Sequence, residues 1–152
     1  MATRAGFVTF IRNSMGITAA VLPDASTDID AALALAIEIV SDLLSQVSTV
    51  IYDNAVYNLA GHNLIEDAQD VTPTVIYQNG LPYFAYWRSE WKINMFVPGV
   101  LSSTSDEGTS SAYNNPEFMN RLMMSDLQLI KTPFGRAYLG YAQRIGSHWG
   151  IS

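Results

Sequence analysis

The sequence has 152 residues, of which 49% are hydrophobic, 14% are charged and none is cysteine, so it excludes a disulfide framework, a thiolate zinc site and a cysteine nucleophile. The net charge of −6 argues against binding to nucleic-acid phosphates, and no uncharged run is long and continuous enough to cross a membrane. We therefore expect a soluble protein, made inside the cell, that forms one domain over residues 1–152.

Two helices are predicted in the first third of the chain. The first is a short helix at 5–14, with Phe7, Phe10 and Ile11 on one side. After a turn-rich segment at 22–28, one continuous helix is expected from Asp28 to Val47, because apolar residues recur there at helical spacing. Its apolar face consists of Ile29, Leu33, Ile37, Val40, Leu44 and Val47.

A second long helix is expected from Thr49 to Gln69. Apolar residues cover most of its circumference, so we place it at the centre of a bundle. Gly61 within it costs helix propensity, which predicts that a neighbouring element packs closely there. The acids near its end oppose the helix dipole and predict a cationic partner from elsewhere in the chain. These acids are Glu66, Asp67 and Asp70.

Two interpretations are open for residues 72–92. Asn79-Gly80 is a strong turn signal and favours a hairpin. Alternatively, Pro82 is the first position of a short helix that carries Phe84, Trp87 and Trp91 on one stripe. We favour the short helix.

The last third of the chain predicts a hairpin and two helices. Ser/Thr-rich arms in residues 100–114 flank a glycine-containing turn and predict an exposed β-hairpin, whose order would depend on a neighbour because a lone hairpin is marginal in water. The alternative is a loop. A helix is expected at 115–129, and Thr132-Pro133 begins a last helix that ends at Gly146.

Together these elements predict a mainly α fold. It is a small helical bundle built on the two long central helices, with a β-hairpin inserted near residues 100–114. A short C-terminal tail at 147–152 contains Trp149, which we expect to dock on another surface.

Charge is distributed unevenly along the chain. Nine acids and no Lys or Arg lie between Asn13 and Trp87. From Leu127 onward there are three cations and no acid, and these cations are Lys131, Arg136 and Arg144. Such polarity suits head-to-tail association, in which the basic face of one copy meets the acidic face of the next. The alternative is a solvated surface with no such role.

A search for chemistry finds one candidate pair. His62 and Glu66 stand four residues apart on a predicted helix, a spacing that could serve a metal or acid–base catalysis. No third ligand is suggested by the spacing, and a histidine satisfied by its carboxylate neighbour is the more common arrangement. The sequence contains no nucleophile elbow and no phosphate-binding loop. We expect no catalytic, cofactor or metal-binding residue, and a protein that acts by shape and association rather than as an enzyme.

Four segments resemble a known family when taken in order. They are Tyr57–Gly61 (YNLAG), Ser102–Ser111 (SSTSDEGTSS), Leu127–Leu139 (LQLIKTPFGRAYL) and Gln143–Gly146 (QRIG). Together they resemble the head-to-tail adaptor, or connector, proteins of tailed bacteriophages, most closely those of contractile-tailed phages. Each segment is short and chemically plain, so their order along nearly the whole chain carries the resemblance.

The resemblance implies a structural virion protein that performs no chemistry. Such adaptors are small helical bundles with an inserted hairpin. They form a ring, usually twelvefold, beneath the portal protein at the neck of the virion. The ring extends the channel through which DNA passes without specific binding during genome retention and ejection. It also presents a surface to the next neck or tail protein.

Contacts with other subunits or with the tail are expected at the hairpin, at the three cations near the C-terminus and at one tryptophan. The predicted residues are Ser105, Asp106, Glu107, Gly108, Thr109, Lys131, Arg136, Arg144 and Trp149. Two alternative functions are a tail-terminator or other neck or tail assembly subunit and, from a different class, a small helical enzyme that uses His62 and Glu66. A monomeric regulator that binds a partner helix is a third.

Overall fold

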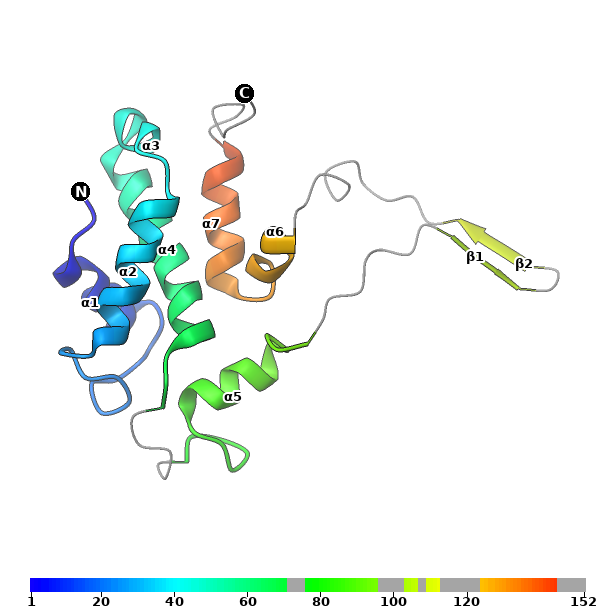
Figure 1. Ribbon diagram of the computed structural model, residues 1–152, viewed down its shortest axis with the longest axis horizontal. Helices are drawn as coiled ribbons and strands as arrows, with labels where there is room; N and C mark the ends of the chain where they lie inside the picture. Colours follow the sequence, from blue (N-terminus) through cyan, green and yellow to red (C-terminus); the bar gives the residue numbers. More distant parts are fainter. Residues whose placement is uncertain (71–75, 96–102, 107–108, 113–123, 145–152) are drawn as a thin grey trace.

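The computed structural model describes residues 1–70, 76–95, 103–106, 109–112 and 124–144, and this part of the chain is mainly helical (Figure 1). The helices are α1 (Arg4–Asn13), α2 (Thr27–Ile39), α3 (Leu43–Val47), α4 (Thr49–Asp67), α5 (Tyr83–Glu90), α6 (Met124–Leu129) and α7 (Pro133–Arg144). The predicted mainly α bundle is confirmed. None of the helices described combines the length and the apolar character that a membrane crossing requires.

Helix α4 lies at the centre of the bundle, as predicted. It packs against α2 and α7, and α1 and α3 also contact it (Figure 1). Ala55, Val56 and Ala60 along it are fully buried. Gly61 lies so close to α1 and the turn after it that an added Cβ would stand 3.3 Å from both Phe10 and Met15, which confirms the predicted close packing.

The single helix predicted from Asp28 to Val47 is wrong, because the chain breaks after Ile39 and restarts as α3. The backbone of Val40 is extended, with ψ of 121°, and the Ser41 hydroxyl accepts the N–H of Leu43. Serine and aspartate offer the backbone hydrogen bonds that compete with a continuing helix. The break buries Val40 but leaves Val47, at the end of α3, 63% exposed.

The Asn79-Gly80 turn and the short helix that were considered for residues 72–92 are both present. Asn79 and Gly80 have positive φ angles of 51° and 76° and form a tight turn, with Gln78 bridged to Leu81. Helix α5 follows, with Pro82 as its N-cap residue, so the favoured helix is confirmed. Tyr77 holds the turn onto this helix, because its ring contacts those of Tyr83, Tyr86 and Trp87.

Two short strands lie within the segment predicted as a hairpin. β1 (Ser103–Asp106) pairs antiparallel with β2 (Thr109–Ala112), with Ser103 opposite Ala112. Figure 1 draws this pair apart from the helices. The remainder of 100–114, including the predicted turn residues 107–108, lies outside the described residues.

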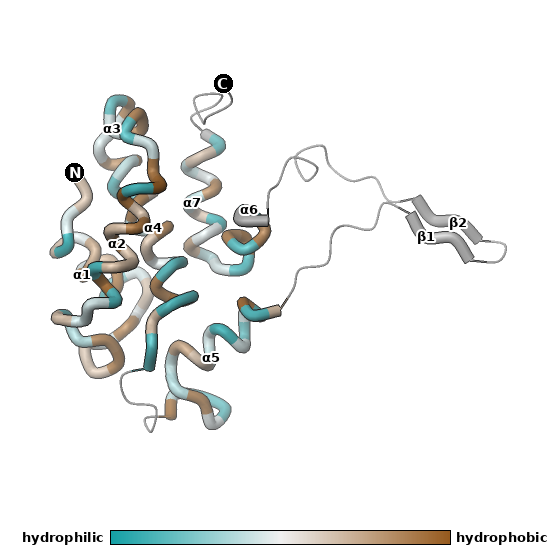
Figure 2. Tube along the Cα trace, viewed as in Figure 1, coloured by the Kyte–Doolittle hydropathy of each residue, from teal (hydrophilic) through white to brown (hydrophobic). Residues whose placement is uncertain are grey.

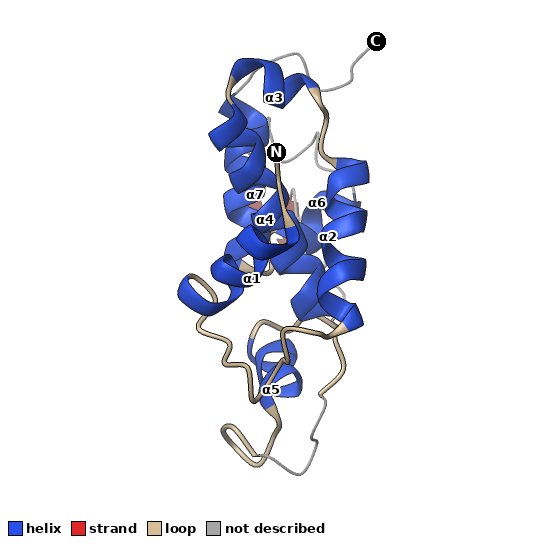
Figure 3. Ribbon diagram, turned by 90° about the vertical axis from the view of Figure 1, so that its left-hand side faces the viewer, coloured by secondary structure: helices blue, strands red, loops and turns tan. Residues whose placement is uncertain are grey.

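The C-terminal helices agree with the prediction where they are described. Helix α6 covers the last part of the helix expected at 115–129, and residues 115–123 lie outside the described part. Helix α7 begins at Pro133 as predicted, and its expected end at Gly146 and the tail 147–152 again lie outside. Figures 1 and 3 place α3 and α5 at opposite ends of the bundle.

Candidate functional site

His62 connects α4 to the start of α7. The residue is 3% exposed, and its Nδ1 lies 2.8 Å from Oγ1 of Thr132. The Thr132 hydroxyl also accepts the backbone N–H of Gly135 at 2.9 Å, as an N-cap does. All these groups are satisfied when the hydroxyl donates its hydrogen to Nδ1 and His62 carries its own hydrogen on Nε2.

The other ring nitrogen of His62 faces Glu66, as predicted. Nε2 lies 3.5 Å from Oε2 of Glu66. The hydrogen bond from His62 lowers the pKa of Glu66, partial burial opposes this shift, and the nearby charges of Lys131 and Arg88 lower the pKa further. Glu66 is therefore ionised at neutral pH, and it is the acceptor that satisfies the buried histidine.

The contacts of His62 with Thr132 and Glu66 join α4 to the start of α7 and occupy the polar atoms of the imidazole ring. Both ring nitrogens of His62 are engaged, so neither is open to a substrate or a metal. Among the residues that the structure describes, no three His, Asp or Glu side chains gather where they could hold a metal ion.

Two of the predicted contact residues, Lys131 and Arg136, lie near the turn between α6 and α7. The ammonium group of Lys131 donates to the carbonyls of Ile93 and Met95 at 2.7 and 2.6 Å, so it fixes the segment after α5. Arg136 is exposed and donates to the carbonyl of Ile130 at 2.8 Å. Lys131 therefore has a role within its own subunit that the sequence did not indicate.

The other predicted contact residues are spread over the rest of the chain. Ser105 and Asp106 belong to β1 and Thr109 to β2. Arg144 is the last residue of α7, and nothing is described of its side chain. Glu107, Gly108 and Trp149 lie outside the described residues.

Helices α4 and α5 cap each other. The guanidinium of Arg88, on α5, donates to the carbonyls of Ile65, at 2.8 Å, and Ala68 at the C-terminal end of α4. In return the Asp70 carboxylate accepts two N–H groups in the first turn of α5, from Phe84 at 2.9 Å and Ala85 at 3.1 Å. Arg88 brings the positive charge predicted for this end of α4, although it bonds to carbonyls and acts on Glu66 only through its nearby charge. The cap from Asp70 was not predicted, because Asp70 was interpreted as an acid at the end of α4.

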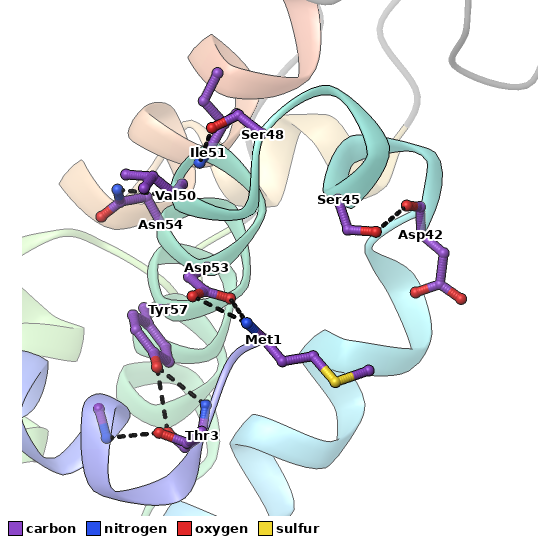
Figure 4. A network of polar contacts seen from close by, with 11 residues as sticks. Met1, Thr3, Asp42, Ser45, Ser48, Val50, Ile51, Asp53, Asn54 and Tyr57 are labelled. Carbon is purple, nitrogen blue, oxygen red and sulfur yellow. Dashed lines mark hydrogen bonds and ion pairs between the residues drawn. The ribbon is translucent and has the colours of Figure 1, made fainter.

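Tyr57, in the first of the four resembling segments, fastens the N-terminus to α4 (Figure 4). Its hydroxyl accepts the N–H of Thr3 at 3.0 Å and donates to the Thr3 carbonyl at 3.3 Å. The terminal amine of Met1 lies 3.3 Å from the Asp53 carboxylate one turn earlier on α4. These contacts hold α1 against the central helix.

An exposed apolar surface, which we call the α3 face, lies where α2, α3 and α4 meet. Its four large side chains are each between 50% and 66% exposed. They are Ile39, Leu43, Val47 and Val50. Brown segments mark the end of α2 and α3 in Figure 2. Glu38 and Asp42 are exposed beside these residues, and the sequence has no Lys or Arg from residue 14 to residue 86.

A groove of about 370 Å³, which we call the α5 groove, lies at the other end of the bundle. Among the residues that the structure describes, its lining contains two cations and no acid. The lining residues are Ala85, Arg88, Ser89, Lys92, Asn94 and Met95. Lys92 and Met95 are exposed, so a charge and an apolar side chain are both available to a partner.

Two buried tyrosines should make the protein sensitive to alkali. Burial raises the pKa of Tyr83 and of Tyr138 to about 12, whereas in the unfolded chain each titrates near its ordinary value of 10. The neutral tyrosines therefore contribute fully to the free energy of unfolding below pH 10. This contribution, about 2 kcal/mol for each tyrosine, is lost as the pH rises from 10 to 12. Unfolding by urea at a series of pH values checks this. The Tyr83→Phe, Tyr138→Phe double variant should lose stability less steeply above pH 10, and equal slopes would contradict the assignment.

No protein-family model, curated protein or solved structure matches this chain.

Proposed function

We propose that this protein is a head-to-tail adaptor of a tailed bacteriophage. In this role it is a structural virion subunit whose copies form a ring between the portal protein and the next neck or tail protein. The ring extends the DNA channel for genome retention and ejection. The site of action is the neck of the virion, after synthesis in the host cytoplasm.

The observation that supports this proposal most is the packing of the resembling segments against one another. Residues 57–61 lie in the middle of α4, and residues 127–139 run from α6 into α7. Helices α4 and α7 are in extensive contact, and the bond between His62 and Thr132 joins them. Two of the four segments that carry the resemblance, residues 57–61 and 127–139, thus lie in helices that pack against each other.

The distribution of surface properties also favours assembly. The α3 face exposes four large apolar side chains, and exposed apolar groups gathered in one place are typical of interaction surfaces. The polar groups at His62, Arg88 and Asp70 are occupied in joining helices. Shape and association therefore account for these residues better than catalysis does.

The proposal is tested by purifying the protein and imaging it with and without the portal protein of the same phage. A ring that binds the portal end-on is the expected result. A ring of different symmetry that binds tail tubes and not the portal would favour a tail-terminator. A stable monomer that binds neither would contradict the proposal.

Charge reversal at the α6–α7 turn should separate assembly from folding. Arg136→Glu is expected to weaken ring assembly while changing the unfolding free energy by less than about 0.5 kcal/mol, because Arg136 is exposed. Lys131→Glu is expected to lower that free energy by about 2 kcal/mol, because it removes the donor to two carbonyls. Sedimentation velocity and thermal melts of both variants measure the two effects. Unchanged assembly of Arg136→Glu would count against this residue as a subunit contact.

A further inference from the structure

The α3 face and the α5 groove are complementary in charge. Glu38 and Asp42 lie beside apolar side chains at the α3 face. Arg88 and Lys92 lie beside Met95 in the α5 groove, and Glu90 on the same helix is not part of its lining. One surface is acidic and apolar, and the other is basic and includes the exposed apolar side chain of Met95.

The two surfaces cannot meet within one molecule. They belong to α3 and α5, which Figures 1 and 3 both place at opposite ends of the bundle. Complementary patches at opposite ends of one chain pair between copies, and each copy then offers one patch and receives the other. A repeated contact of this kind closes into a ring or continues as a filament.

We propose that the α3 face of one copy docks in the α5 groove of the next copy, with Leu43 against Met95 and Asp42 against Lys92. This inference rests on the proposed function for the closure of the assembly, and it names the contact between subunits. Burial of the apolar side chains would stabilise the contact. The opposite charges would favour the α3 face meeting the α5 groove over either surface meeting its own kind. Leu43 and Asp42 are both exposed at the start of α3, so both side chains are available to a partner.

The backbone at Lys92 supports a role for its charge. Lys92 has a φ of 52°, in the left-handed region that favours glycine. The N–H of Ile93 bonds to the carbonyl of Arg88, and that of Lys92 to the carbonyl of Ser89, so Lys92 occupies the position after a helix where glycine is most common. Backbone strain of this kind clusters at functional sites, and Lys92 lines the groove, so the strain supports a role for its side chain there.

The first test compares single variants by sedimentation velocity over a range of concentrations. Leu43→Asp, Asp42→Lys and Lys92→Glu should each weaken association about tenfold or more. Ile76→Asp is the matched control, because Ile76 is a 65% exposed apolar residue outside both surfaces, and it should leave association unchanged. Lys92→Gly should both raise the Tm and weaken association. If the lysine had only a structural role, the substitution would leave association unchanged.

The second test mixes two variants that fail alone. Asp42→Lys has a reversed face and an intact groove, whereas Lys92→Glu has an intact face and a reversed groove. Every contact in an alternating assembly of the two is again between opposite charges, so the mixture should regain association. The chain that carries both substitutions should also associate.

Three outcomes decide on this contact, and the last two separate it from the proposed function. Specific interfaces have dissociation constants well below about 1 mM. Wild-type protein that stays monomeric at that concentration therefore overturns the contact. Wild-type rings that bind the portal and are unaffected by the three variants also overturn the contact but leave the adaptor function standing. Association that depends on the three residues, without any binding to the portal, supports the contact and overturns the adaptor function.

Discussion

Replacing Gly135 by alanine should destabilise the protein by about 3 kcal/mol or more. A Cβ at this position would stand 2.1 Å from the carbonyl oxygen of Leu129, 2.7 Å from its carbonyl carbon and 2.8 Å from its Cα. All three are backbone atoms of the end of α6, so no side-chain rotation relieves the overlap. Either α6 or α7 must move, and the bond between Thr132 and His62 lies beside the moved segment.

Gly140→Ala is the matched control in the same helix. An added Cβ at Gly140 meets nothing within 4 Å, so the only effect expected is the better helix propensity of alanine, which stabilises by up to about 1 kcal/mol. The two substitutions are chemically identical and should change stability in opposite directions. Urea unfolding monitored by circular dichroism measures both. If Gly135→Ala unfolds at the same urea concentration as the wild type, the close approach of α6 to α7 is wrong.

Gly135 also shows what the sequence could and could not reveal. It stands in the segment that resembles the adaptor family, but a glycine inside a helix is locally only a cost in propensity. Glycine is needed at position 135 because the backbone of Leu129 at the end of α6 lies against it, and this contact follows from the tertiary fold. Gly61 was more accessible to prediction, because a glycine in the middle of a helix that is apolar on most sides has few explanations other than close packing.

Periodicity predicted the central helix well and its neighbour less well. Helix α4 is buried along most of its length, so its apolar residues and its burial agree. In α2 and α3 the apolar spacing continues across Ser41 and Asp42, although the helix does not. Local hydrogen bonds ended the helix there. Beyond the break, Leu44 of the predicted apolar stripe is still in the core, whereas Val47 is exposed on the α3 face.

Long-range polar contacts were predicted only where one partner gave a local signal. The pair of His62 and Glu66 is visible as an i, i+4 spacing, and it exists. Thr132 was predicted as the start of a helix, but its bond to His62 joins residues 70 positions apart. The cap from Asp70 to α5 likewise depends on how two helices meet, which no spacing in the sequence encodes.

Arg88→Met should destabilise the protein by about 2 to 3 kcal/mol, the second largest effect expected. Arg88 is half-buried, its guanidinium satisfies two carbonyls at the C-terminal end of α4, and it lies 6.0 Å from the centre of the Phe84 ring. Methionine keeps the apolar stem but leaves both carbonyls without this donor. Arg136→Met is the control, because Arg136 also donates to a backbone carbonyl but is exposed, and water replaces its bond at a cost of about 0.5 kcal/mol or less. Unfolding by urea at a concentration where the protein is monomeric gives both values, and equal losses would mean that the junction of α4 and α5 does not depend on the charge of Arg88.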